Sequence, residues 1–295
     1  MRSAGSGVLL LWIVQCLWLG AGYAADAPPS ANLNEEALKQ ERIYHSAGDQ
    51  VPSGYTIDRG ISDYARALAN DFDPALAKLS PSERWLDIGA GSGRAVLDYY
   101  SVEYNLQHRR DSVLRGRQAN SIAMSIEDRR TKEWEKTAAS LAPNQLQYLY
   151  DKRLRDYTVG ELGLFQIITD VIGGFSYSEN LSLVMEKVLE FLELNGSFYT
   201  LLQDVHSEAG SNKPYYANAP YLTEIADADG AEVKVCSWLK SISCVEVSCD
   251  LKTDWRPPVE SYRVKKVCND VRVPTLTLMH YTAGTPPERR YRLQK

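Results

Sequence analysis

The feature of this 295-residue sequence with the clearest chemical meaning is a set of glycines behind a short apolar segment. Residues 85–88 form that segment and contain Asp87, and Gly89, Gly91 and Gly93 follow. Glycine lets backbone N–H groups approach a ligand closely, and N–H groups at the start of a helix attract a nucleotide-like ligand. The spacing therefore predicts a ligand site where a buried strand turns into a helix.

Two features of this turn separate the candidate ligands. A dinucleotide-binding turn needs its third glycine three residues after the second, and this chain has Arg94 there. Asp87 also puts a carboxylate close to where a pyrophosphate would lie, and like charges repel. A ligand with a cationic amino acid end and no phosphate suits the turn better, and S-adenosylmethionine is such a ligand.

Strand-like and helix-like segments alternate around the turn. Expected strands cover residues 85–88, 122–126, 145–150, 165–171 and 197–202. The clearest expected helices begin at Ile61, Ser92 and Leu181, and the last of them runs to Leu194. Apolar runs separated by helices predict an α/β fold with a mostly parallel central sheet and helices on both faces. Such a sheet binds ligands at the carboxyl ends of its strands, so acids at these ends become candidate site residues.

The last third of the chain has a different pattern. Residues 233–239, 243–249, 264–268 and 275–280 are expected as strands. Their connections are short and lack helical crossovers, which permits antiparallel pairing. We therefore expect residues 206–295 to be a β-rich part of the same domain as the core, residues 61–205.

The segment from Leu86 to Gly93, Leu-Asp-Ile-Gly-Ala-Gly-Ser-Gly, resembles motif I of the class I methyltransferases. The resemblance covers roughly residues 61–202, and extends loosely to the tail as the family's closing antiparallel hairpin. It implies a Rossmann-like fold with S-adenosylmethionine as the cofactor. Within the turn, it implies as cofactor-binding residues Asp87, Gly89, Ala90, Gly91 and Gly93.

The same resemblance assigns roles to acids after the later strands. Glu127 follows the second strand and would bind the ribose hydroxyls, with neighbouring Asp128 as the alternative. Asp151 follows the third strand and would face the adenine. Asp170 opens the segment 170–177, which would face the transferred methyl group. That segment lacks the Asn/Asp-Pro-Pro-aromatic signature of methylases that modify amino groups of nucleic acids.

These observations predict an enzyme that transfers methyl from S-adenosylmethionine to a small molecule or a protein. A nucleic-acid acceptor is not expected, since the net charge is -5 and no long basic stripe occurs. No nucleophile–base pair is evident, and His206 is the best-placed candidate for a general base. An exported binding module that kept the fold and lost catalysis is the alternative, whereas the glycine spacing disfavours a nicotinamide-dependent oxidoreductase.

The amino terminus has the layout of a secretory signal peptide. Arg2 precedes an apolar run over residues 8–19, and small residues around Ala24 predict cleavage after that residue. We expect an exported chain, periplasmic or secreted, with no stable membrane association after cleavage; an uncleaved anchor is the alternative. Residues 25–60 would be a leader that includes a candidate lid around His45 and Tyr55.

Four cysteines remain after the predicted cleavage, all in the β-rich tail: Cys236, Cys244, Cys249 and Cys268. An even number in an exported chain predicts two disulfides. A zinc site is the rival, although the spacings lack the paired Cys-x-x-Cys pattern of zinc ribbons. Three connectivities are open, and sequential pairing is favoured because it closes the shortest loops.

Overall fold

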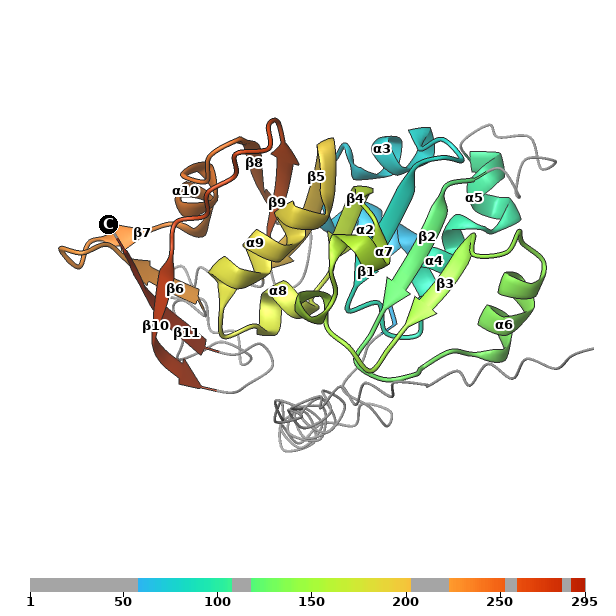
Figure 1. The fold of residues 1–295 in the computed structure, drawn as a ribbon, viewed down its shortest axis with the longest axis horizontal. Helices are drawn as coiled ribbons and strands as arrows, with labels where there is room; N and C mark the ends of the chain where they lie inside the picture. The colour runs from blue at the N-terminus through green and yellow to red at the C-terminus, as the bar shows by residue number, and fades with distance from the viewer. Residues whose placement is uncertain (1–57, 108–117, 203–222, 253–258, 283–287, 295) are drawn as a thin grey trace, which may run out of the picture.

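A seven-stranded sheet forms the centre of the molecule (Figure 1). The structure is a computed structural model, and it describes residues 58–107, 118–202, 223–252, 259–282 and 288–294. The strand order is β3-β2-β1-β4-β5-β9-β8. The first five strands of this order run parallel, and the last two form an antiparallel hairpin.

The parallel strands end at one edge of the sheet, four of the five in register. These strands are β1 (Arg84–Ile88), β2 (Asn120–Met124), β3 (Leu146–Leu149), β4 (Phe165–Asp170) and β5 (Leu192–Leu202). Ile88 aligns with Met124 on one side and Asp170 on the other, and Met124 aligns with Leu149. The loops that follow β1, β2, β3 and β4 therefore start from a single row of residues.

Helices cover both faces of the sheet, as the sequence predicts. One face carries α2 (Ile61–Ala67), α3 (Phe72–Lys78), α4 (Arg94–Tyr99), α5 (Val102–Gln107) and α6 (Lys132–Ala139). The other carries η2 (Leu154–Asp156), α7 (Val159–Leu162), α8 (Gly174–Tyr177), α9 (Leu181–Phe191) and α10 (Val235–Lys240). Successive side chains of a strand point to opposite faces, so Trp85 and Leu86 join different apolar clusters.

The closing hairpin consists of β8 (Val245–Lys252) and β9 (Val259–Lys266), and β9 pairs antiparallel with β5. This confirms the expected antiparallel region. The expected strand over residues 233–239 is wrong, because most of that segment forms α10. Val235, Trp238 and Leu239 stand at helical spacing and are all buried, so a helix buries them on one stripe.

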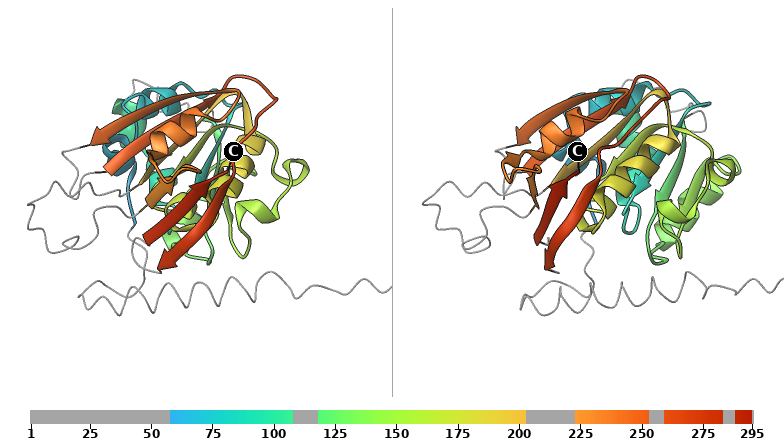
Figure 2. Two further views of the ribbon diagram at one scale, coloured as in Figure 1. Left: turned by 90° about the vertical axis from the view of Figure 1, so that its left-hand side faces the viewer. Right: turned by 60° about the vertical axis from the view of Figure 1, so that its left-hand side comes forward.

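A second sheet of four strands lies beside the first, at the end of the molecule away from β3 (Figures 1 and 2). Its order is β10-β11-β6-β7, with strands β6 (Thr223–Ala226), β7 (Glu232–Val233), β10 (Leu276–Thr282) and β11 (Glu288–Leu293). Buried Arg289 on β11 donates from Nη1 to the carbonyls of Phe175 and Ser178, at 2.9 and 2.8 Å. This arginine fastens the second sheet to α8.

The junction between α9 and β5 differs from the expectation of a helix to residue 194. The helix ends at Phe191 and the strand begins at the next residue. The buried ammonium group of Lys266 donates to the carbonyls of Leu189 and Leu192, at 2.9 and 3.0 Å. A lysine at this place satisfies carbonyls that a helix end leaves without partners, so the chain can turn sharply into the sheet.

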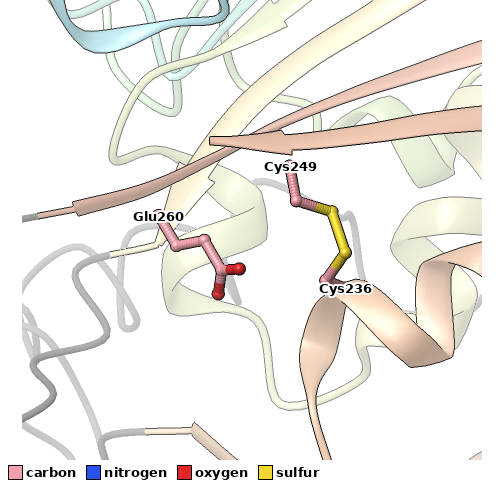
Figure 3. A group of neighbouring side chains, drawn as sticks. All are labelled: Cys236, Cys249 and Glu260. Carbon is pink, nitrogen blue, oxygen red and sulfur yellow. A yellow bond between two sulfur atoms is a disulfide. The ribbon is translucent and has the colours of Figure 1, made fainter. Parts of the chain in front are cut away.

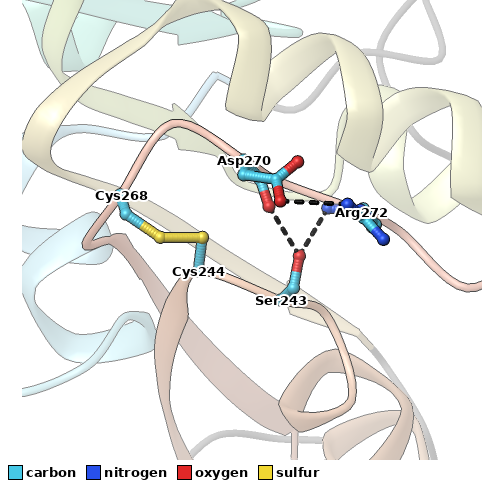
Figure 4. Close-up of a disulfide and its surroundings, with 5 residues drawn as sticks. All are labelled: Ser243, Cys244, Cys268, Asp270 and Arg272. Carbon is cyan, nitrogen blue, oxygen red and sulfur yellow. Dashed lines mark hydrogen bonds and ion pairs between the residues drawn. A yellow bond between two sulfur atoms is a disulfide. The ribbon is translucent and has the colours of Figure 1, made fainter.

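Two disulfides lie in the tail, which confirms that part of the prediction. Cys236 of α10 is bonded to Cys249 of β8, and Cys244 is bonded to Cys268 (Figures 3 and 4). The favoured sequential pairing is therefore wrong. Cys244 stands just before β8 and Cys268 just after β9, and the pairing of these two strands brings them together.

The second bridge sits in a tightly hydrogen-bonded turn (Figure 4). The Ser243 hydroxyl donates to the carbonyl of Asp270 at 2.8 Å and accepts the backbone N–H of Arg272 at 2.7 Å. The Arg272 side chain pairs with the Asp270 carboxylate at 3.1 Å. These contacts join the segments before β8 and after β9 independently of the disulfide.

Several sequence predictions concern residues outside the described ranges. They are the signal peptide, the lid residues His45 and Tyr55, and His206. The proposed division into residues 1–24, 25–60, 61–205 and 206–295 stays a prediction. Within the described part of the chain, no helix combines the length and apolar character needed to cross a membrane.

Candidate functional site

The glycine turn occupies the central position at the carboxyl edge of the sheet. Gly89, Gly91 and Gly93 have φ angles of 69°, 59° and 78°, in the left-handed region that glycine adopts most readily. A Cβ atom on Gly93 would collide with the Trp134 ring. The turn leads directly into α4, and its Ala90 is buried. The left-handed backbone conformation and the close packing against Trp134 thus both favour the glycines of this motif.

The turn after β1 touches the turn after β4. A Cβ atom on Gly89 would lie 2.6 Å from the Cα of Gly173, and one on Gly173 would lie 2.8 Å from the carbonyl oxygen of Ile88. Neither position has room for a side chain. The close approach of the two turns therefore depends on Gly173 as well as on the first set of glycines.

Asp87 is fully buried at the end of β1. Its oxygen Oδ1 accepts a hydrogen bond from the Thr169 hydroxyl at 2.6 Å, and the Tyr64 hydroxyl lies 3.1 and 3.0 Å from the two oxygens. Burial raises the pKa of Asp87 to about 7, and these hydroxyl donors offset the rise only in part. Its carboxylate holds α2 and β4 against β1, and its cofactor contact stays a prediction.

Asp170 is equally buried and organises the neighbouring turn. Its Oδ1 accepts the N–H of Gly173 and its Oδ2 accepts the N–H of Phe175, both at 2.8 Å. Burial raises the pKa of Asp170 to about 7, against the opposing effect of these N–H donors. The carboxylate therefore shapes the start of α8, and its contact with a cofactor stays a prediction.

Glu127 and Asp128 lie in the loop after β2 and have different partners. The Glu127 carboxylate pairs with Arg129 at 3.0 Å and its side chain is 36% exposed. Asp128 binds Arg130 through both of its oxygens, at 2.8 and 2.6 Å. The hydrogen bonds from Arg130 lower the pKa of Asp128. Glu127 thus makes fewer hydrogen bonds to its arginine neighbour than Asp128 does, and its ribose role stays a prediction.

Asp151 lies two residues beyond the end of β3 and is exposed. Its φ angle of 67° is unusual for a residue other than glycine, although aspartate tolerates it better than most. Because β3 ends in the same row as β1 and β2, this acid is at the edge that carries the glycine turn. The role facing adenine stays a prediction.

Two tyrosines of the site were missed by the sequence analysis. Tyr64 of α2 bonds Asp87, and Tyr148 of β3 bonds the carbonyl of Gly91 in the glycine turn. Each lies in an apolar segment of the sequence, where a tyrosine looks like any other large core residue. The one sequence signal is its hydroxyl, because a buried phenol needs a hydrogen-bond partner.

Asp58, just before α2, was also missed. Its carboxylate accepts the backbone N–H of Ser92 at 2.9 Å, inside the glycine turn. A second bond has its acceptor on the other side of this contact: Asp98 of α4 accepts the backbone N–H of Ile61 at 3.0 Å. The chain leading into α2 is thus attached directly to the glycine turn.

One group of potential metal ligands occurs among the described residues, on β8, β9 and α10, several strands away from the glycine turn along the same edge. It consists of Cys236, Cys249 and Glu260, whose ligand atoms lie within 4.8 Å of one another (Figure 3). The two sulfur atoms are bonded to each other, and Glu260 accepts a hydrogen bond from Tyr262 at 2.8 Å. In this form the cysteines offer no thiolate to zinc.

Strand order and turn geometry together decide the fold. Parallel strands β3-β2-β1-β4-β5 continue into the antiparallel pair β9-β8, and β1 ends in a left-handed glycine turn that starts a helix. The chain has the class I methyltransferase fold. The sequence prediction of fold class is therefore confirmed, with the second sheet as an addition to it.

Solved structures of methyltransferases resemble this methyltransferase fold at low sequence identity. An rRNA methylase from Streptococcus thermophilus is 11% identical over 72% of this chain and 99% of its own, with a TM-score of 0.39. The antibiotic-resistance methyltransferase Kmr is 14% identical over 71% and 95%, with a TM-score of 0.38.

Precorrin-6y C5,15-methyltransferase from Geobacter metallireducens is 12% identical over 66% of this chain and 85% of its own, with a TM-score of 0.36. No family model and no curated protein matches the sequence. At these identities and TM-scores the likeness does not extend to an activity.

Proposed function

We propose that this protein binds S-adenosylmethionine at the carboxyl edge of its seven-stranded sheet and transfers the methyl group to a small molecule or a protein. The observation that carries the proposal is the glycine turn. Its three left-handed glycines follow Ile88, which stands in one row with the last residues of β2, β3 and β4. Glycines let the backbone approach a nucleoside closely, and the Asp87 carboxylate beside the turn would repel a phosphate.

The residues around the turn fit the chemistry of that cofactor. Glu127 is half-buried and its carboxylate can accept two hydrogen bonds from ribose hydroxyls. Asp87 and Asp170 are buried acids beside the turns after β1 and β4. When ionised, they would attract the positive charges on the amino group and the sulfur of the cofactor. The exposed Asp151 is the proposed partner of the adenine.

When bound, S-adenosylmethionine supplies a methyl group that its sulfonium already activates. The protein then has to hold the cofactor and orient the acceptor, since in-line positioning can supply much of the rate. A poorly acidic acceptor would need a general base, and His206 remains our candidate for it. The segment 170–177 is the proposed wall on the acceptor side.

A small-molecule or protein acceptor agrees with the charge of the chain. The net charge of -5 gives no bulk attraction for phosphates, and segment 170–177 lacks the nucleic-acid methylase signature. We therefore propose no nucleic-acid partner.

The two disulfides are consistent with an oxidising, exported environment. We propose that residues 1–24 are a signal peptide and that the mature chain is secreted or periplasmic, without stable membrane association. Because S-adenosylmethionine is made inside cells, an exported enzyme would have to obtain its cofactor from elsewhere. This location therefore favours a second candidate function, a binding module that kept the fold without catalysis.

Calorimetric titration of the oxidised mature chain with S-adenosylmethionine and with NAD tests the proposal. We expect saturable binding of S-adenosylmethionine and none of NAD. Binding of NAD alone would overturn the cofactor assignment. Transfer of isotopically labelled methyl to a panel of small molecules and proteins then separates the two candidates, because a binding module retains the cofactor without consuming it.

A further inference from the structure

The hydroxyl of Tyr148 connects two loops at the cofactor edge. It bonds the carbonyl of Gly91 in the glycine turn and lies 3.2 Å from the carbonyl oxygen of Glu127. It also accepts the backbone N–H of Arg129 at 3.3 Å. A phenol has one proton, so the two carbonyls share it. A single side chain, 8% exposed, thus ties the loop after β1 to the loop after β2.

The aromatic ring of Tyr148 is held as firmly as its hydroxyl. It packs edge-on against Trp134 of α6, with 5.2 Å between ring centroids and 80° between planes. The same Trp134 ring occupies the space where a side chain on Gly93 would lie. Burial raises the pKa of Tyr148, so the hydroxyl keeps its proton at neutral pH and remains a donor.

Tyr100 provides a structural counterpart at the opposite edge of the sheet. Its hydroxyl bonds the carbonyls of Ala119 and Gln145, at 2.6 and 2.9 Å, and lies 3.1 Å from the Ser121 hydroxyl. These partners stand where β2 and β3 begin, whereas those of Tyr148 stand where β1 and β2 end. The two tyrosines make similar networks, and only one of them is at the cofactor edge.

We propose that Tyr148 is a positioning residue that couples the glycine turn to the loop of Glu127 and thereby sets the affinity for the nucleoside part of the ligand. The identity of that ligand rests on the proposed function. Without the hydroxyl, the carbonyl of Gly91 and the N–H of Arg129 lose their shared partner. The two loops can then move independently of each other, and the Glu127 carboxylate is no longer held at a fixed distance from the glycine turn.

Binding of S-adenosylmethionine to Tyr148→Phe and Tyr100→Phe tests this role, because each substitution removes only a hydroxyl. We expect Tyr148→Phe to weaken binding by a factor of about three to ten, the scale of one hydrogen bond. Tyr100→Phe should lower the melting temperature and leave the affinity unchanged. Equal losses of affinity in both variants would overturn the proposal.

A double-mutant cycle with Glu127→Ala separates positioning from general weakening of the fold. If Tyr148 acts through Glu127, adding Tyr148→Phe to Glu127→Ala should change the affinity by less than it does in the wild type. Full additivity would show that Tyr148 does not act through the acid, and would overturn its assignment.

Hydrogen exchange without ligand tests the linkage even if the cofactor assignment fails. We expect faster exchange in Tyr148→Phe for peptides covering residues 89–93 and 127–130, and wild-type exchange there in Tyr100→Phe. Unchanged exchange in Tyr148→Phe would overturn the coupling. If the wild type does not bind S-adenosylmethionine, the proposed function fails, while the exchange result still decides whether Tyr148 joins the two loops.

Discussion

The hydroxyl of Tyr64 lies within hydrogen-bonding distance of both carboxylate oxygens of Asp87, at 3.1 and 3.0 Å. Tyr64 belongs to α2, which precedes the parallel strands, whereas Asp87 belongs to β1 at the centre of the sheet. Thr169 of β4 donates to the same carboxylate. The acid of the glycine motif therefore fastens a helix to two adjacent strands.

This arrangement predicts a pH dependence of stability. Burial raises the pKa of Asp87 to about 7, above its value in the unfolded chain, so the folded state holds its proton more tightly. The stabilising contribution is complete at pH below about 4, declines as the pH rises toward 7 and is lost above that. Asp87→Asn cannot ionise, so its melting temperature should fall less than that of the wild type between pH 4 and pH 8.

Asp170 has a pKa raised to about 7 by burial as well, so Asp170→Asn should also flatten the profile. Identical slopes in wild type, Asp87→Asn and Asp170→Asn would contradict the assignment.

Gly91→Val should abolish binding of S-adenosylmethionine. The side chain would add bulk where backbone approaches the ligand, at a φ angle of 59°. The left-handed conformation should also reduce the free energy of unfolding by about 1–2 kcal/mol. Gly230→Val is the control, because Gly230 has a φ of 86° and open space around it. Calorimetry and thermal melts should show similar destabilisation in both variants and loss of binding in Gly91→Val alone.

Glu127→Ala should weaken binding of S-adenosylmethionine by roughly 1.5–3 kcal/mol, the scale for hydrogen bonds to a charged group. Asp128→Ala should have a smaller effect, since Arg130 already engages both of its carboxylate oxygens. Titration of both variants checks the assignment. A larger loss in Asp128→Ala would transfer the ribose role to that residue, and no loss in either would point to another pocket.

Each disulfide should stabilise the folded chain by about 2–4 kcal/mol. The bridges span 13 and 24 residues, so loss of Cys244–Cys268 should lower the melting temperature more than loss of Cys236–Cys249. Paired Cys→Ser variants measured without reductant test this order. Peptide mapping without reduction tests the pairing itself, and four alkylatable thiols in the purified oxidised protein would contradict both bridges.

Local sequence patterns were enough to predict much of the fold. The glycine turn, the strands β1 to β5 and the helix α9 depend on residues close in sequence, whose types set backbone conformation and apolar periodicity. The acids after β2, β3 and β4 could be predicted for the same reason, since the ends of parallel strands share one edge. Sequence thus determined the fold class and the location of the glycine turn.

Tertiary structure decided which of those acids are buried and what holds the site together. Tyr148 and Gly91 are 57 residues apart, and Asp87 and Thr169 are 82 apart. The choice of Cys268 as the partner of Cys244 follows from the pairing of β8 with β9. Hydrogen bonds, raised pKa values and disulfide pairs depend on which distant residues the packed chain brings within reach, and the spacing of residue types does not specify those neighbours.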